Sequence, residues 1–130
     1  MERVIIADDS ATARMVIRRC LEIAGLAGAE FLEAANGLEA LELLEWGPPD
    51  LLVTDLTMPV MGGLDLLKRL KEDEEFNNVP VLVISSAKNE ANEQEMKELG
   101  AFAVLPKPVN PAMLAEALSP LLPDKGGAAW

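Results

Sequence analysis

At the centre of the sequence stands DLLVTDLTMPVMGG, residues 50–63. Residues 51–53 form a short apolar run that is typical of a buried parallel strand, and the run ends at Asp55, ahead of a proline and two glycines. Asp55 is therefore expected where a buried strand gives way to a loop. In open α/β sheets, ligands bind at the carboxyl ends of the strands, because a rigid scaffold holds the loops there.

Three other short apolar runs also end in polar side chains, which predicts three more strands of the same kind. Residues 4–7 lead into Asp8-Asp9-Ser10, residues 81–84 lead into Ser85-Ser86, and residues 102–105 lead through Pro106 to Lys107. If all these strands are parallel, their carboxyl ends meet at one edge of a sheet. Three carboxylates, a hydroxyl and one ammonium group would then converge.

Apolar residues at helical spacing fill the segments between these runs. The expected helices lie between Ser10 and Gly25, from Gly37 to about Trp46, from Gly63 towards Asn77, over residues 89–99, and between Asn110 and Pro120. In the first helix, Val16 and Ile17 are expected on the buried face and Arg14 on the opposite one. In the second, Leu38 is expected on the buried face, and Trp46 is expected to pack at the helix end.

A fifth, brief strand is expected at Phe31 and Leu32. Five strands that alternate with five helices predict an α/β fold, a doubly wound parallel sheet of the flavodoxin-like type with strand order 2-1-3-4-5. This order places the first and third strands side by side. Asp8 and Asp9 are therefore expected next to Asp55.

The composition limits the classes of function. A chain of 130 residues, half of them hydrophobic, fits one domain, residues 1–122, with a loose tail, residues 123–130. The net charge of −11 argues against nucleic acid or an anionic membrane as a partner, since both attract clustered basic residues. No apolar run approaches transmembrane length, the single Cys20 cannot form an internal disulfide, and the chain has no histidine. We therefore expect a cytoplasmic protein with protein partners.

Three carboxylates in one pocket repel each other unless a cation lies among them. A hard divalent cation relieves the repulsion, and Mg²⁺ suits a small open cluster because it binds few carboxylates, keeps several waters and often takes a phosphoryl oxygen. An aspartate that faces such a metal can also act as a nucleophile towards phosphorus and form an aspartyl phosphate. Ser85 and Lys107 could each hold a phosphoryl oxygen there.

Over nearly its whole length, the sequence resembles the receiver domains of two-component response regulators. Four blocks in the same order carry the resemblance: residues 4–10, residues 50–63, residues 80–85, and Gly100-Ala101 with Lys107-Pro108. The resemblance implies a phosphorylation-driven switch that changes its affinity for a downstream protein. It implies a phosphoacceptor regulator rather than an enzyme with an external substrate. Such a receiver could stand alone or belong to a longer protein.

The resemblance also implies a role for each residue that handles the phosphoryl group. Asp55 would accept it from a histidine kinase or a phosphotransfer protein. Ser85 would supply the switch hydroxyl, with Ser86 as its rival for that role. Lys107 would contact the phosphoryl group, and its peptide bond to Pro108 would be cis.

By the same resemblance, Mg²⁺ would be the cofactor. Asp9, Asp55 and the backbone carbonyl of Thr57 would bind the ion directly, and Asp8 would bind it through water. Two other classes of protein remain open. A haloacid-dehalogenase-like phosphohydrolase also uses an aspartyl phosphate, but it needs a second aspartate where Thr57 stands. A phosphorylation-independent scaffold of the same fold would not need the acidic cluster and lysine.

The sequence departs from the family pattern in three places. Val104 stands where many members carry an aromatic switch residue, Gly62 replaces a frequent aspartate, and Pro106 precedes the lysine. The helix expected over residues 89–99 also has the thinnest apolar stripe of the chain. We therefore expect residues 86–100 to carry the signal, with Val104 passive.

Overall fold

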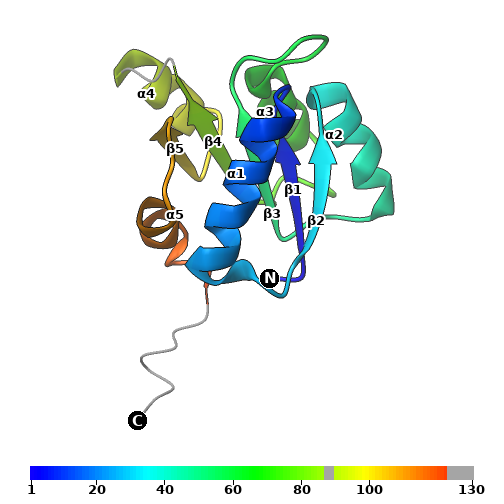
Figure 1. Cartoon of the computed structure of the whole chain (residues 1–130). Helices are drawn as coiled ribbons and strands as arrows, with labels where there is room; N and C mark the ends of the chain where they lie inside the picture. The colour runs from blue at the N-terminus through cyan, green and yellow to red at the C-terminus, as the bar shows by residue number, and fades with distance from the viewer. Residues whose placement is uncertain (87–89, 123–130) are drawn as a thin grey trace.

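The computed structural model describes residues 1–86 and 90–122, in which five strands alternate with five α-helices (Figure 1). The strands are β1 (Arg3–Ala7), β2 (Glu30–Ala34), β3 (Leu51–Asp55), β4 (Val81–Ser85) and β5 (Ala103–Pro106). The α-helices are α1 (Ala11–Leu21), α2 (Gly37–Leu43), α3 (Gly63–Glu72), α4 (Glu90–Glu98) and α5 (Pro111–Leu118). Two short helical turns, η1 (Glu22–Leu26) and η2 (Leu44–Trp46), extend α1 and α2.

The strands form one parallel sheet in the order β2-β1-β3-β4-β5, which confirms the predicted topology. In Figure 1 the arrowheads of β1 and β2 point to the same edge of the sheet, towards the top of the view. Ala7 pairs with Thr54 of β3, and Asp55 pairs with Ile84 of β4. The residues that follow β1, β3 and β4 therefore leave the sheet side by side.

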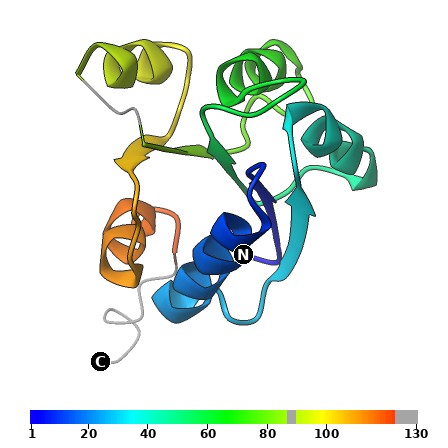
Figure 2. The same ribbon diagram turned by 45° about the horizontal axis from the view of Figure 1, so that its top comes forward.

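Both faces of the sheet are covered, and each face has its own hydrophobic core (Figure 2). Successive side chains of a strand point to opposite faces, so Ile5 packs with the residues of α2, α3 and α4, whereas Ile6 packs with those of α1 and α5. The central strands are buried on both faces. This burial explains why their sequences are continuous apolar runs rather than alternating ones.

The predicted helix ends are confirmed where a side chain caps them. Ser10, Asn36 and Asn110 are the N-caps of α1, α2 and α5, and each side chain accepts a hydrogen bond from a backbone N–H in the first turn. At the other end of the first helical segment, Gly25 has a φ of 129°. Only glycine adopts this left-handed conformation readily, so the helix breaks there.

Three predicted side-chain positions away from the site are wrong. α1 packs through Ile17, Cys20 and Leu21, and Val16 falls outside this narrow stripe and is exposed. Leu38 is exposed because Gly37 and Ala40 make the buried contacts of α2. The side chain of Trp46 is 74% exposed and does not pack at the helix end. Instead the backbone carbonyl of Trp46 accepts a 2.8 Å hydrogen bond from the Arg3 guanidinium, which ties η2 to β1.

The loop between β3 and α3 is unusually close to the strand that precedes it. The N–H of Gly63 donates to the carbonyl of Leu56 at 2.9 Å, and a Cβ atom at Gly63 would lie 2.2 Å from the carbonyl oxygen of Asp55. No side chain fits at that distance, so glycine is required where α3 begins. The loop therefore returns directly over the end of β3.

None of the described helices is long and apolar enough to cross a membrane. The predicted tail, residues 123–130, lies outside the described residues, as do residues 87–89 of the segment predicted to carry the signal.

Candidate functional site

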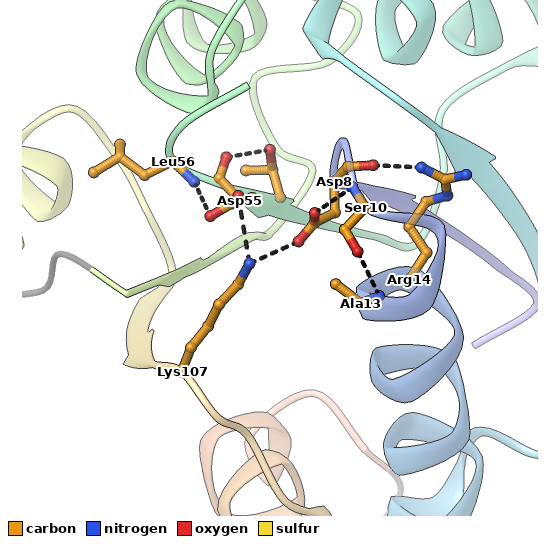
Figure 3. A network of polar contacts seen from close by, with 8 residues as sticks. Asp8, Ser10, Ala13, Arg14, Asp55, Leu56 and Lys107 are labelled. Atoms are coloured by element: carbon orange, nitrogen blue, oxygen red, sulfur yellow. Dashed lines mark hydrogen bonds and ion pairs between the residues drawn. The ribbon is translucent and has the colours of Figure 1, made fainter. Parts of the chain in front are cut away.

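Asp55 is the last residue of β3, and its side chain lies at the carboxyl edge of the sheet (Figure 3). The residue is only 8% exposed. One carboxylate oxygen, Oδ1, accepts a hydrogen bond from the N–H of Leu56 at 2.9 Å, and the other, Oδ2, lies 3.4 Å from Nζ of Lys107. Both oxygens are therefore oriented by neighbouring groups.

Asp8 follows β1 directly and is fully buried. Its Oδ1 accepts a 2.9 Å hydrogen bond from the N–H of Ser10, and its Oδ2 accepts one from Nζ of Lys107, also at 2.9 Å. The N–H of Asp8 itself donates to the carbonyl of Ala34 in β2 at 3.0 Å. The turn after β1 is thus attached to β2, α1 and β5.

Asp8, Asp9 and Asp55 come together as predicted. Each offers a carboxylate oxygen, and the three oxygens lie within 4.8 Å of one another. Asp9 is exposed whereas the other two are buried, so the cluster opens to solvent on the side of Asp9. A few carboxylate oxygens with access to water are the donor set that Mg²⁺ prefers over a fully enclosed cage.

The pKa of Asp55 is raised above the ordinary value of an aspartate. Burial contributes most to this rise, and the negative charge of Asp8 adds to it. The positive charge of Lys107 and the hydrogen bond from Leu56 act in the other direction but do not outweigh these effects. The ionised form of Asp55 is therefore disfavoured in the absence of a further cation.

Lys107 reaches the site from the end of β5, and its peptide bond to Pro108 is cis, as the family resemblance implied. Burial lowers the pKa of Lys107, but its hydrogen bond to Asp8 and the charges of Asp55 and Asp8 outweigh burial and raise the pKa overall. The lysine therefore stays protonated. Its ammonium group bridges the two buried carboxylates.

The remaining predicted residues lie around this centre. Ser85 is the last residue of β4 and is buried, and its carbonyl accepts a hydrogen bond from the N–H of Lys107 at 3.1 Å. Ser86, the rival hydroxyl, is exposed. Thr57 is exposed in the loop after β3, two residues beyond Asp55.

One residue of the site was placed on the wrong side of its helix by the sequence pattern. The side chain of Arg14 in α1 is only 16% exposed, not solvated, and its guanidinium donates to the backbone carbonyl of Asp8 and to Glu33. Helical side chains lean towards the N-terminus of their helix, so a long residue in the first turn covers the preceding loop. This direction, together with the helical spacing that places Arg14 on the same face as Ile17 and Leu21, is the signal that could have identified it.

Comparisons with known proteins agree with this geometry. A family model of the response regulator receiver domain matches residues 4–119. Chemotaxis protein CheY-3 of Vibrio cholerae is 36% identical over 116 residues, which cover 89% of this chain and 88% of that protein. The polar-differentiation response regulator DivK of Brucella anthropi is 30% identical over 121 residues, 93% of this chain and 96% of that protein.

Solved structures show the same relationship. The chemotaxis response regulator CheY4 of Vibrio cholerae superposes with a TM-score of 0.81 at 32% identity, covering 94% of this chain and 99% of that one. The CheY in a complex with CheX, BeF₃ and Mg²⁺ from Borrelia burgdorferi gives a TM-score of 0.78 at 25% identity, covering 94% and 90%. The family match over most of the chain, together with an acidic cluster and a lysine at the carboxyl edge of a 2-1-3-4-5 sheet, shows that the chain belongs to the response regulator receiver domains, the phosphorylation-activated switches of two-component systems.

Proposed function

We propose that Asp55 is the phosphoacceptor of this receiver domain and that phosphorylation requires Mg²⁺. One observation carries the proposal: the oxygens of Asp8, Asp9 and Asp55 lie within 4.8 Å of one another, beside the ammonium group of Lys107. Asp55 lies at the end of the central strand and keeps 8% exposure, whereas Asp8 is fully buried, so Asp55 is the better placed of these two carboxylates to meet an incoming phosphoryl group.

In the proposed reaction, a carboxylate oxygen of Asp55 attacks the phosphorus of a phosphohistidine on a histidine kinase or phosphotransfer protein. A bond forms between this oxygen and phosphorus while the P–N bond to the donor imidazole breaks, and its electron pair stays on the imidazole nitrogen. Acetyl phosphate would react in the same way with acetate as the leaving group. Later attack by water returns the carboxylate of Asp55 and releases inorganic phosphate.

The chain's own residues have distinct roles in this proposal. Asp9, Asp55 and the carbonyl of Thr57 would hold Mg²⁺, and Asp8 would hold it through water. The bound ion would neutralise the charge that builds up between the carboxylates and the phosphoryl oxygens. Lys107 would exchange its contact with Asp55 for a phosphoryl oxygen, and the hydroxyl of Ser85 would bind another.

The similar CheY structure supports the choice of ligands, since it was solved with BeF₃ and Mg²⁺ and in complex with CheX. By analogy, we propose that the phosphorylated chain changes its affinity for a downstream protein and turns over no external substrate of its own. A cytoplasmic location agrees with such partners. The position of Thr57 disfavours the phosphohydrolase alternative, because those enzymes need an aspartate there.

Intact mass after incubation with acetyl phosphate and Mg²⁺ tests the proposal. The wild type is expected to gain the mass of one phosphoryl group, and Asp55→Asn none. Asp50→Asn serves as the matched control, because Asp50 precedes the same strand but binds the N–H groups of Glu2 and Arg3 instead. Equal incorporation in wild type and Asp55→Asn would rule out Asp55 as the acceptor.

A further inference from the structure

The side chain of Arg14 joins three parts of the fold next to the acidic cluster. Its Nη1 donates to the backbone carbonyl of Asp8, in the turn after β1 (Figure 3). Its Nε donates to Glu33 of β2 at 2.8 Å. Arg14 itself belongs to α1, and its backbone N–H is bonded to the carbonyl of Ser10 at 3.0 Å. The guanidinium, on a side chain that extends from α1, therefore links the turn after β1 to β2.

The carbonyl that Arg14 holds belongs to the peptide unit between Asp8 and Asp9. A peptide unit is planar, so fixing the direction of its carbonyl also fixes its N–H and limits the path of the chain through Asp9. The carboxylate of Asp8 is fixed separately by the N–H of Ser10 and by Lys107. Asp9, by contrast, is exposed. The direction of the Asp9 carboxylate thus depends strongly on how this peptide unit is held.

We infer that Arg14, braced by Glu33, is a positioning residue of the magnesium site, which keeps the Asp9 carboxylate within reach of Asp55. The inference rests on the proposed function, since it assumes that Asp9 and Asp55 bind the ion together. Groups that orient the ligands of a metal typically change its affinity by about 10-fold to 100-fold when they are removed.

The inference can be tested because the two effects of Arg14 on the affinity for Mg²⁺ are opposite: its charge weakens binding, whereas its proposed positioning of Asp9 strengthens it. A guanidinium near a cation site repels the cation, so removal of its charge alone would strengthen Mg²⁺ binding. If Arg14 positions Asp9, its removal weakens binding despite that gain. Arg18 is the matched control, since it is one turn further along α1 and contacts Glu22 and the ring of Phe31 rather than the turn.

The experiment is a calorimetric titration of the full chain with Mg²⁺ at constant ionic strength. Arg14→Met is expected to bind Mg²⁺ about tenfold more weakly than the wild type or worse. Arg14→Lys is expected to lose less, because one ammonium group can still reach the carbonyl. Arg18→Gln is expected to bind as the wild type does or slightly more tightly. Thermal unfolding without metal shows whether each variant is folded, and Glu33→Gln tests the inference if Arg14→Met does not fold.

Substitution of Glu33 gives a second, independent test of the inference. If Glu33 acts through Arg14, Glu33→Gln weakens Mg²⁺ binding in the wild-type background but has no further effect in Arg14→Met. A direct effect of the Glu33 charge would persist in both backgrounds. Wild-type affinity in folded Arg14→Met or, failing that variant, in Glu33→Gln would overturn the inference alone, provided that Asp55→Asn abolishes binding. Absence of Mg²⁺ binding in the wild type would overturn both the inference and the proposed function.

Discussion

Two aspartates that flank the same strand face opposite environments. At the end of β3, burial and the charge of Asp8 raise the pKa of Asp55. Before the start of the strand, the backbone N–H groups of Arg3 and Glu2 bind the carboxylate of Asp50 and lower its pKa. The ionised form of an aspartate is therefore disfavoured at the site, relative to a free aspartate, and favoured at the opposite end of the strand. A bound cation would therefore stabilise the ionised form of Asp55, whereas the ionised form of Asp50 is already stabilised by hydrogen bonds.

This contrast predicts opposite effects of two conservative substitutions on the metal-free protein. The ordinary pKa of an aspartate, which applies to the unfolded chain, is 3.8. Because the pKa of Asp55 is higher than this in the folded protein, the free energy of unfolding falls as the pH rises from 3.8 through the folded pKa. Asp55→Asn removes this loss and is expected to be more stable than the wild type at neutral pH. The gain should disappear below pH 3.8, where the carboxyl group is protonated in both states.

Asp50→Asn should do the reverse. A lowered folded pKa contributes stability above pH 3.8, which is lost as the pH falls through the folded value. The substitution is therefore expected to cost about 0.5–1 kcal/mol at neutral pH, a modest amount because solvent screens this exposed carboxylate. Urea unfolding at several pH values with EDTA present measures both differences. If the free energy of unfolding depends on pH in the same way in the wild type and in Asp55→Asn, the pKa of Asp55 is not raised in the folded protein.

At the scale of elements, the sequence allowed the strands and their polar ends to be predicted because a parallel sheet gathers them at one edge. The convergence of Asp8 and Asp55 follows from strand order alone. Arg14 was misplaced because it was assigned to the solvated face with the other charged residues, although its spacing from Ile17 and Leu21 puts it on the buried face of α1, where a long side chain can lean back to the preceding turn. Trp46 was misplaced because the pattern of apolar residues does not show whether a helix end meets a neighbour.

The backbone of the loop between β3 and α3 lies against neighbouring backbone at two points. It passes over Asp55 at Gly63, and its Met61 carbonyl accepts a 2.8 Å hydrogen bond from the N–H of Gly37 at the start of α2. The carbonyl of Thr57, the proposed magnesium ligand, lies within this loop. Its position should therefore depend on how α3 begins.

Gly63→Ala tests this dependence. The added Cβ would lie 2.2 Å from the carbonyl oxygen of Asp55, so the loop or the end of β3 must move. We expect a loss of about 1–3 kcal/mol in the free energy of unfolding, together with weaker Mg²⁺ binding. Gly28→Ala is the control, because nothing lies within 4 Å of the added atom there. It is expected to be neutral or to stabilise by about 0.4–1 kcal/mol. Equal effects of the two substitutions would show that the close approach at Gly63 is unimportant.

For the molecule as a whole, a switch requires one part that moves while the rest stays packed. α3 buries Leu66, Leu67 and Leu70 against the sheet. In α4, Met96 is the buried side chain among residues 93–98, the portion whose side chains the structure describes. A pocket of about 260 Å³ is also lined by residues of both α4 and the β3–α3 segment, namely Leu56, Leu64, Glu95 and Met96. Over residues 93–98, α4 therefore has fewer buried side chains than α3, and segments with few buried contacts open most readily.

The energy available from phosphorylation fits a lightly held element. Moving a two-state equilibrium from about 1:99 to 99:1 needs roughly 5.5 kcal/mol of differential interaction. Hydrogen bonds from Ser85 and Lys107 to a charged phosphoryl group are worth about 1.5–3 kcal/mol each. Together they barely complete the shift. Val104 is buried in β5 and has no ring to reorient, so it offers little additional energy.

We therefore predict that phosphorylation acts through residues 86–100, of which 87–89 lie outside the described part, and that Val104 stays passive. Amide hydrogen exchange with and without beryllofluoride and Mg²⁺ measures this directly. Protection is expected to change across α4 and little across α3. Ser85→Ala should reduce the change much more than Val104→Ala, because Ser85 is the one of the two that would donate a hydrogen bond to the phosphoryl mimic. Unchanged exchange over residues 86–100, or equal effects of the two substitutions, would mean that the signal leaves the site by another route.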